Sequence, residues 1–247
     1  MENLYIDYYD VTSYHADFKQ QLSPVSLFCF LQESAWHHAT SKSFGYEHLA
    51  ERNEFWILSK VNVLIHRMPN WAEKIRLETW GKEPELLTAF RDFELFDSNN
   101  QPIIHATSSW HILNMQTHRP MKLTHFADDF PVINRQAIAE KPQKIQLPAS
   151  NGMKSADFTV FPSDIDLNQH VNNTKYIQWA MDCIPLEFQK QHHLREINVN
   201  FLSESYIGEN YFIETYQNEL NFIHFIISGK ENRKLAAVQS SWISDLA

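Results

Sequence analysis

Acidic, amide and imidazole side chains are concentrated in residues 163–179, which read SDIDLNQHVNNTKYIQW. Asp166, Asn168 and His170 alternate within this stretch, so an extended segment would project all three side chains to one side. These residue types can activate water, orient an imidazole and hydrogen-bond a developing oxyanion. The stretch directly precedes a predicted helix over residues 174–184, and we expect a catalytic site at the start of that helix.

The start of this helix offers further polar groups. Asn172, Asn173 or Thr174 can cap it. The backbone N–H groups near Val171 or Asn172 are predicted donors to an oxyanion, beside the Asn168 amide. The alternative interpretation is a turn rich in capping residues, because Asx turns account for Asp and Asn at a helix start. That alternative does not account for the histidine, so we favour the site.

The motif D-x-D-x-N-x-H-V-N-N-x-K-Y-x-x-W, at residues 164–179, resembles the signature of the acyl-acyl carrier protein thioesterases. Plant plastid enzymes and shorter bacterial relatives share that signature. The resemblance extends over nearly the whole chain, and since no plastid transit peptide is seen, a bacterial-type relative is the better match. It implies hydrolysis of fatty acyl thioesters, chiefly acyl-acyl carrier protein, in fatty acid biosynthesis and lipid metabolism.

The resemblance also implies roles for individual residues. Asp166, Asn168 and His170 match the family's D-x-N-x-H positions, and Glu204 takes the place of its downstream acidic residue. Ser205 stands where the plant enzymes have a cysteine, so a cysteine nucleophile at that position is excluded. The nucleophile is then either water or Ser205.

We therefore expect water attack on the thioester carbonyl. Glu204 and His170 would share the general-base work, and Asp166 would hold the imidazole in the right orientation. Asn168 and a backbone N–H would bind the oxyanion, with Asn172 a further candidate. No cofactor is expected, because the substrate itself carries the phosphopantetheine arm. No metal is expected either, because the adjacent histidines 37–38 and 192–193 do not face one site.

Two stretches with the same order of elements make up the chain, which indicates an internal duplication. The first unit, residues 1–113, has strand-like residues 1–20, a helix over 25–40, and strands over 55–66, 74–80, 87–96 and 102–113. The second unit, residues 156–247, has a strand over 158–161, the helix over 174–184, and strands over 196–201, 210–217, 221–228 and 234–243. Both units end in a Ser-Ser-Trp strand, at residues 108–110 and 240–242.

One long apolar helix followed by four or five antiparallel strands describes a hotdog unit, in which the sheet wraps around the helix. The predicted fold class is therefore α+β, a tandem (double) hotdog. Residues 114–155 form a proline-punctuated connector, with a helix predicted over residues 133–140.

The first unit contains no D-x-N-x-H run, so we expect it to be non-catalytic and to shape an acyl tunnel. Its candidate lining residues are Phe28, Leu31, Trp56 and Trp110. The alternative is that they are ordinary core residues, since large apolar side chains are mostly interior.

Composition narrows the function classes. The chain has 247 residues and a formal net charge of -9, which argues against nucleic-acid binding. Two cysteines, Cys29 and Cys183, do not make a disulfide framework; we predict buried, unreactive thiols and a cytoplasmic protein. No stretch reaches the roughly 18 consecutive apolar residues of a membrane helix.

Several alternatives stay open at this stage. An acyl carrier protein partner is acidic and needs a basic face, for which the candidates are Arg67, Lys74, Arg76 and Lys82, although a solvated strand face also explains them. Another hotdog activity, an acyl-CoA thioesterase or a hydroxyacyl dehydratase, is one alternative function. A non-catalytic acyl-binding protein is another. Monomer and homodimer are both open, as is the preferred acyl chain length.

Overall fold

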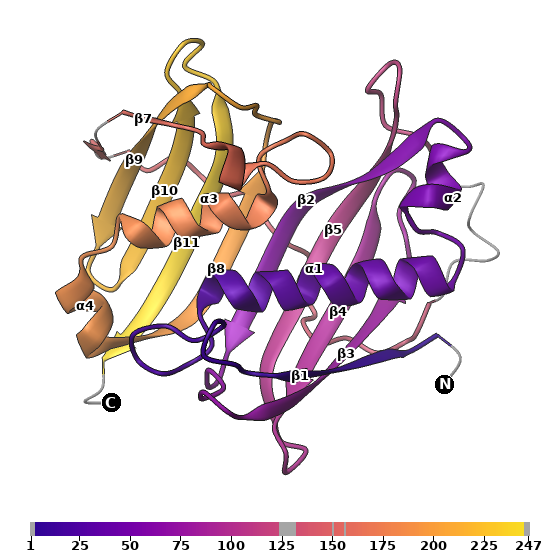
Figure 1. Cartoon of the computed structure of the whole chain (residues 1–247), viewed down its shortest axis with the longest axis horizontal. Helices are drawn as coiled ribbons and strands as arrows, with labels where there is room; N and C mark the ends of the chain where they lie inside the picture. The colour runs from indigo at the N-terminus through magenta and orange to yellow at the C-terminus, as the bar shows by residue number, and fades with distance from the viewer. Residues whose placement is uncertain (1–2, 124–131, 150, 156, 245–247) are drawn as a thin grey trace. The chain divides into compact units, whose positions relative to one another are not determined.

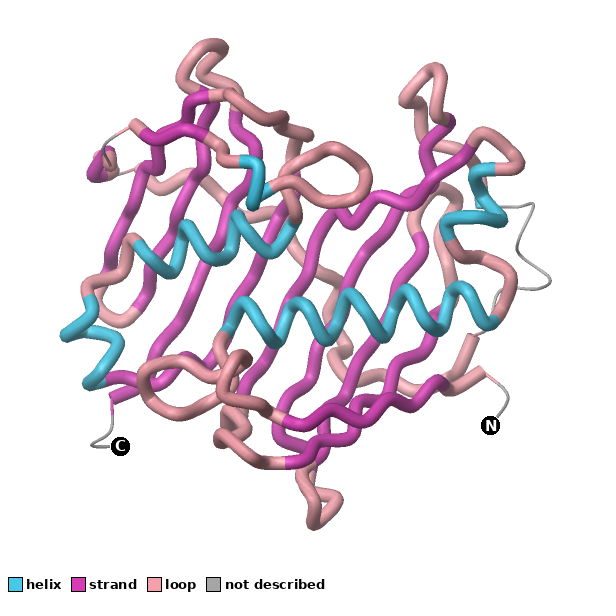
Figure 2. The backbone as a smooth tube through the Cα atoms, in the orientation of Figure 1, coloured by secondary structure: helices cyan, strands magenta, loops and turns pink. Residues whose placement is uncertain are grey.

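The computed structural model describes residues 3–123, 132–149, 151–155 and 157–244. The chain divides into two compact units, Met1–Pro142 and Gln143–Ala247. Each unit, taken by itself, is an antiparallel sheet with a helix lying across one face (Figures 1 and 2). The predicted α+β fold class, with one hotdog unit in each half, is confirmed.

The first unit contains one long helix and five strands. Its elements are β1 (Tyr5–Asp10), α1 (Pro24–Ser41), α2 (Tyr46–Ala50), β2 (Glu54–Ile65), β3 (Lys74–Lys82), β4 (Ala89–Phe96) and β5 (Pro102–Asn114). The strand order is β1-β3-β4-β5-β2, and all neighbours are antiparallel. The sequence predicted every one of these elements except α2, whose five residues are too few to show helical periodicity.

Helix α1 begins where the sequence indicates. Ser23 caps it by accepting the backbone N–H of Ser26 at 3.1 Å, and Pro24 occupies the first turn, where its missing N–H costs nothing. Side chains at helical spacing along α1 are buried, among them Leu27, Leu31 and the polar His38. The apolar periodicity therefore places this helix on its sheet, as predicted.

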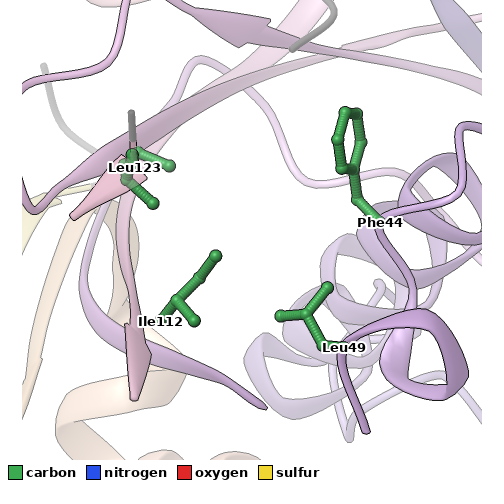
Figure 3. Close-up of a cluster of buried hydrophobic side chains, with 5 residues drawn as sticks. Phe44, Leu49, Ile112 and Leu123 are labelled. Atoms are coloured by element: carbon green, nitrogen blue, oxygen red, sulfur yellow. The ribbon is translucent and has the colours of Figure 1, made fainter. Parts of the chain in front are cut away.

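A cluster of apolar side chains packs α2 and the loop before it against the first sheet. Phe44 and Leu49 lie opposite Ile112 and Leu123 (Figure 3), and Ala89 completes the buried set. The cluster brings together buried residues that are distant in sequence, so it forms a hydrophobic core within the first unit.

The helix predicted over residues 133–140 is wrong. This segment is an extended strap on β3: Ile133 donates its backbone N–H to Gly81 O at 3.0 Å, and Trp80 Nε1 donates to Arg135 O at 2.9 Å. The Arg135 guanidinium pairs with both Glu78 and Glu94. Lys82 and Asp92 of the sheet also bind the backbone of Ile138 and Ala137, so several backbone groups of the strap have partners on the sheet and not along a helix.

The strap changes the assignment of the predicted connector. Residues 114–142 belong to the first compact unit, and residues 143–155 belong to the second. Within the second part, β6 (Met153–Lys154) pairs with β9. Residues 124–131 and 150 of the predicted connector lie outside the described residues.

The second unit repeats the helix-and-sheet plan. After β6 come β7 (Phe158–Thr159), the 3₁₀ turn η2 (Pro162–Asp164), α3 (Asn173–Asp182), α4 (Leu186–Gln191), β8 (His192–Phe201), β9 (Asn210–Asn218), β10 (Asn221–Ser228) and β11 (Lys234–Ser244). The strand order is β8-β11-β10-β9-β6, and β7 also pairs with β9. Helix α3 buries Tyr176, Ile177, Ala180 and Met181. The short elements β6, η2 and α4 were not predicted.

The two Ser-Ser-Trp strands carry the same local structure. Trp110 Nε1 donates to Ser108 Oγ at 2.8 Å in β5, and Trp242 Nε1 donates to Ser240 Oγ at 3.0 Å in β11. Opposite each tryptophan the partner strand changes register, within β2 in the first unit and within β8 in the second. A shared bulge at a shared motif supports the duplication inferred from the sequence.

Within the described residues, no helix is both long and apolar enough to cross a bilayer.

Replacing Arg135 by alanine is predicted to lower the free energy of unfolding by about 2 kcal/mol, because Glu78 and Glu94 lose a charged hydrogen-bond donor. These carboxyl residues are only 7% and 9% exposed. Urea unfolding of the full chain measures the change. Arg119→Ala, at an exposed arginine of the same unit, is the control and is expected to change stability by less than about 0.5 kcal/mol. Equal effects of the two substitutions would contradict the role assigned to the strap.

Candidate active site

The loop between β7 and α3 is held closed by Asp164. The Asp164 carboxylate accepts the backbone N–H of Phe161 at 2.9 Å and lies 3.3 Å from Lys175 Nζ. The backbone carbonyl oxygen of Asp164 accepts the backbone N–H of Asn172 at 2.8 Å. These contacts return the chain to the start of α3, and Figure 2 shows the loop as a rounded bend.

The residues that alternate in sequence form a tight turn here. Asp166 donates its backbone N–H to His170 O at 2.9 Å, and Gln169 donates to Asp166 O at 3.0 Å. The Asp166 carboxylate accepts the backbone N–H of Asn168 at 2.8 Å, and Gln169 adopts a left-handed φ of 65°. The segment is therefore not extended, so the condition under which Asp166, Asn168 and His170 would all project to one side is not met. Local side-chain-to-backbone hydrogen bonding favours the turn instead.

A second chain segment, which follows β8, meets this turn. Val171 donates its backbone N–H to Ser205 O at 3.0 Å. That contact brings Glu204 beside His170, with 3.7 Å between Glu204 Oε1 and His170 Nδ1. The two side chains are 31% and 29% exposed, so each is partly shielded and still reachable by water. The structure thus joins the acid and the imidazole that the sequence could only name separately.

Ser205 forms a buried hydroxyl pair with Tyr176. Its residue is 1% exposed, and its Oγ lies 2.5 Å from the Tyr176 hydroxyl of α3. Burial raises the pKa of Tyr176 to about 12, with the Ser205 hydrogen bond opposing the change, so the phenol keeps its proton at neutral pH. Arg233 Nη1 also donates to Glu204 O at 3.0 Å. These contacts fix the backbone that carries Glu204.

Tyr206 is a neighbour of the pair that sequence reasoning missed. Its hydroxyl donates to Glu204 Oε2 at 3.1 Å, and its ring meets the His170 ring edge-on at 5.0 Å between centroids. The residue lies in a loop without periodicity. Its place two positions after Glu204 was the one signal that could have pointed to it.

The backbone donors predicted for an oxyanion are engaged elsewhere. Asn172 N–H donates to Asp164 O and Val171 N–H donates to Ser205 O, so these two N–H groups already have acceptors, and an oxyanion donor near them stays a prediction. The Asn172 side chain caps α3 by accepting the backbone N–H of Thr174 at 2.9 Å. The fold uses these groups to join the loop to its surroundings, as polar groups at a helix start generally require partners.

Asn168 and Asp166 occupy different positions in the turn. Asn168 is exposed, and its side-chain amide has no hydrogen-bond partner among the described residues. The Asp166 carboxylate contacts the turn backbone, and the described part of the chain shows no contact between it and the His170 ring. Any effect of Asp166 on the imidazole therefore passes through the shape of the turn.

Both halves of the chain match models of one protein family. The family model "Acyl-ACP thioesterase N-terminal domain" matches residues 2–129, and "Acyl-ACP thioesterase C-terminal domain" matches residues 149–244. The chain belongs to the acyl-ACP thioesterase family. The resemblance seen in the motif is thereby confirmed, and the N- and C-terminal domains of the family correspond to the two hotdog units.

Individual relatives of the acyl-ACP thioesterase family are similar over most of this chain. An oleoyl-acyl carrier protein thioesterase of Arabidopsis thaliana is 27% identical over 220 residues, which are 81% of this chain and 60% of that protein. A palmitoyl-acyl carrier protein thioesterase of Gossypium hirsutum is 27% identical over 79% of this chain and 51% of its own length. The chain thus spans about half to 60% of the length of these relatives.

Solved structures of the family are similar over the whole chain. An acyl-ACP thioesterase from Bacteroides thetaiotaomicron has a TM-score of 0.90 and 26% identity, covering 97% of this chain and 98% of that one. The 12:0-ACP thioesterase from Umbellularia californica has a TM-score of 0.85 at 20% identity, with 98% of both chains covered, and shows the shared fold.

The substrate-lining residues predicted in the first unit lie in or against its core. Phe28 and Leu31 are each 4% exposed on α1. Trp56 and Trp110 are partly buried and pack against the cluster in Figure 3, and Trp56 Nε1 donates to Phe44 O at 2.9 Å. A role of these four in binding the acyl chain of a thioesterase substrate stays a prediction.

The four basic residues considered for carrier docking are each paired with an acid. Arg67 contacts Glu73, Lys74 contacts Asp10, Arg76 contacts Glu78 and Lys82 contacts Asp92. These pairs agree with the solvated or neutralised strand face, and not with a free basic patch for an acidic carrier.

The two cysteines differ in their exposure to solvent. Burial raises the pKa of the Cys183 thiol, which agrees with an unreactive side chain. Cys29 is exposed on α1, so its predicted burial is wrong. The apolar neighbours of Cys29 in sequence face the sheet, whereas the cysteine lies at an outward helical position.

The assignment of Asn172 as a cap predicts a measurable loss. Asn172→Ala should lower the free energy of unfolding by about 1 kcal/mol, because the backbone N–H of Thr174 loses its acceptor. Asn172→Asp keeps an acceptor and should stay close to the original stability. Chemical unfolding of the full chain distinguishes the two. If both substitutions destabilise equally, the side chain has another role.

Proposed function

We propose that the protein hydrolyses fatty acyl thioesters, with acyl-acyl carrier protein as its substrate, and releases free fatty acid. The observation that carries this proposal is the approach of Glu204 Oε1 to His170 Nδ1, 3.7 Å, beside the start of α3. Membership of the acyl-ACP thioesterase family supports it. The names of the relatives describe thioesterases acting on acyl carrier protein, and the same class of substrate is proposed here.

The reaction requires little beyond a positioned water. Water oxygen forms a bond to the thioester carbonyl carbon, and the carbon–sulfur bond then breaks. The proton removed from water is finally transferred to the departing thiolate, so acid and thiol are the products. No cofactor takes part, because the phosphopantetheine thiol belongs to the substrate. A general base in this position typically contributes about 10²–10⁴-fold to the rate.

In this proposal His170 is the base and Glu204 supports it. Because Nδ1 faces the Glu204 carboxylate, that nitrogen carries the proton and Nε2 is left to accept a proton from water. The carboxylate then stabilises the imidazolium that forms. The 3.7 Å separation exceeds a hydrogen bond, and catalytic hydrogen bonds of this kind commonly shorten when substrate binds.

Asn168 is proposed to bind the oxyanion, and Asp166 is proposed to position both neighbours. The exposed amide of Asn168 is a donor at the tip of the turn. Asp166 holds that turn through Asn168 N–H and His170 O, so its effect on chemistry is indirect. We place the reaction in the cytoplasm, which a chain with only two cysteines favours.

His170→Ala and Glu204→Gln are each predicted to lower turnover of an acyl-acyl carrier protein by about 10²–10⁴-fold, since each removes part of the proton-transfer pair. Release of thiol from acyl carrier protein and from acyl-CoA, assayed side by side, measures the activity. Both variants should unfold at nearly the temperature of the unaltered protein, because both side chains are partly exposed.

Glu214→Gln is the matched control for these substitutions. Like Glu204, Glu214 accepts a hydrogen bond from a tyrosine two residues downstream, Tyr216. Glu214 differs in lying within strand β9. This variant should keep the original turnover. Near-normal turnover of both His170→Ala and Glu204→Gln would refute the catalytic assignment, and bound fatty acid without turnover in the unaltered protein would favour an acyl-binding function instead.

Ser205→Ala is predicted to keep turnover within about threefold, because the buried hydroxyl is bonded to Tyr176 and water is the proposed nucleophile. The same change should cost about 1 kcal/mol of stability, since the Tyr176 hydroxyl loses its partner. Steady-state kinetics and urea unfolding measure the two effects. Loss of turnover by several orders of magnitude, with folding intact, would instead identify Ser205 as the nucleophile.

A further inference from the structure

We infer that Tyr206 is a positioning residue for the reaction: its hydroxyl holds the Glu204 carboxylate so that Oε1 faces the imidazole of His170. This inference rests on the proposed function and adds a residue to it. In this role the Tyr206 phenol orients the Glu204 carboxylate and need not touch the substrate.

The geometry divides the two oxygens of Glu204 between two partners. Oε2 accepts the Tyr206 hydroxyl at 3.1 Å, and Oε1 lies 3.7 Å from His170 Nδ1. A carboxylate fixed at one oxygen has a restricted rotation about its terminal bond, so the other oxygen keeps its direction. The Tyr206 ring, edge-on to the imidazole at 5.0 Å, restricts His170 as well.

The phenol is a suitable permanent donor. Burial raises the pKa of the Tyr206 hydroxyl, and the negative charge of Glu204 raises it further. The hydroxyl therefore stays protonated through the pH range in which an imidazole titrates. A donor to a carboxylate favours its charged form, which is the form that stabilises an imidazolium.

The backbone around Glu204 is held by other groups. Arg233 donates to Glu204 O, and Tyr211 of β9 donates to Tyr206 O at 3.4 Å. Ser205 is bonded to Tyr176 of α3. Removing the Tyr206 hydroxyl should therefore free only the Glu204 side chain and leave the loop in place.

The charged and titratable groups near Glu204 come from several elements. His170 belongs to the loop before α3 and Tyr176 to α3 itself. Glu209 precedes β9 and raises the pKa of Tyr206, whereas Arg233 precedes β11 and lowers that pKa. None of these groups donates to Oε2 of Glu204 among the described residues, where the Tyr206 hydroxyl is bound.

The test is Tyr206→Phe, which removes the hydroxyl and keeps the ring. We expect kcat on an acyl-acyl carrier protein of fixed chain length to fall about tenfold, since a hydrogen bond to a charged group is lost. KM should change less than about twofold. The acidic limb of the pH–rate profile, which reports protonation of the base, should move to lower pH, because a carboxylate no longer held toward His170 stabilises the imidazolium less. A purely structural role would lower stability without moving that limb.

Tyr216→Phe is the matched control. It removes an equivalent bond in the same unit, from the Tyr216 hydroxyl to Glu214 Oε2 at 3.0 Å, away from His170. This variant should keep the original kcat and pH–rate profile. Thermal unfolding of both variants verifies that each is folded.

The outcomes separate this inference from the proposed function. Activity of the unaltered protein, its loss in Glu204→Gln, and a lowered kcat with a displaced acidic limb in Tyr206→Phe would support the positioning role. An unchanged kcat and profile in Tyr206→Phe, or equal losses in Tyr206→Phe and Tyr216→Phe, would overturn it while Glu204 kept its role. Absence of thioester hydrolysis by the unaltered protein would refute the proposed function itself.

Discussion

One backbone hydrogen bond determines the geometry of the candidate site: Val171 N–H donates to Ser205 O at 3.0 Å. It joins the loop that carries His170 to the segment that carries Glu204. The Tyr176 hydroxyl of α3 contacts Ser205 as well and supports the same connection. Asn172 N–H to Asp164 O acts within the loop before α3 and closes it on itself. The polar groups at the start of α3 therefore serve mainly to assemble the site, and the chemistry is left to the exposed side chains.

The same fold supports two units with different roles in this interpretation. Each has a helix against an antiparallel sheet, and each has a Ser-Ser-Trp strand whose tryptophan bonds to a serine two residues earlier. The loop before α1 makes the same kind of turn as the loop before α3, with Asp17 N–H donating to Gln21 O and a left-handed φ at Gln20. Gln21, however, stands where the second unit has His170. Duplication thus preserved the core and the bulge, while the sequence at the helix start diverged. Function in such a scaffold depends on the loop, not on the fold.

Much of the fold follows from local patterns. The apolar spacing in α1 and the alternation in β3 and β5 predicted their bounds closely, because side-chain burial and backbone geometry have the same period in these elements. The extended conformation of the strap at residues 133–140 could not be predicted from its local sequence. Its Arg, Gln, Ala and Glu residues are good helix formers, but contacts of Arg135 with Glu78 and Glu94 on the sheet favour the extended conformation. Local propensity is a weak guide where long-range partners satisfy the backbone.

The sequence by itself determined which residues belong to the candidate site, since the order Asp166, Asn168, His170 is a local motif and Glu204 could be named from the family resemblance. Only the tertiary structure decided how they meet. It closed the motif into a turn, assigned the N–H groups of Val171 and Asn172 to the fold, and set Tyr206 against Glu204. The physical reason is that hydrogen bonds within a few residues are encoded by neighbouring side chains. A contact between the loop before α3 and the end of β8 requires the helix and sheet of the second unit to be packed first.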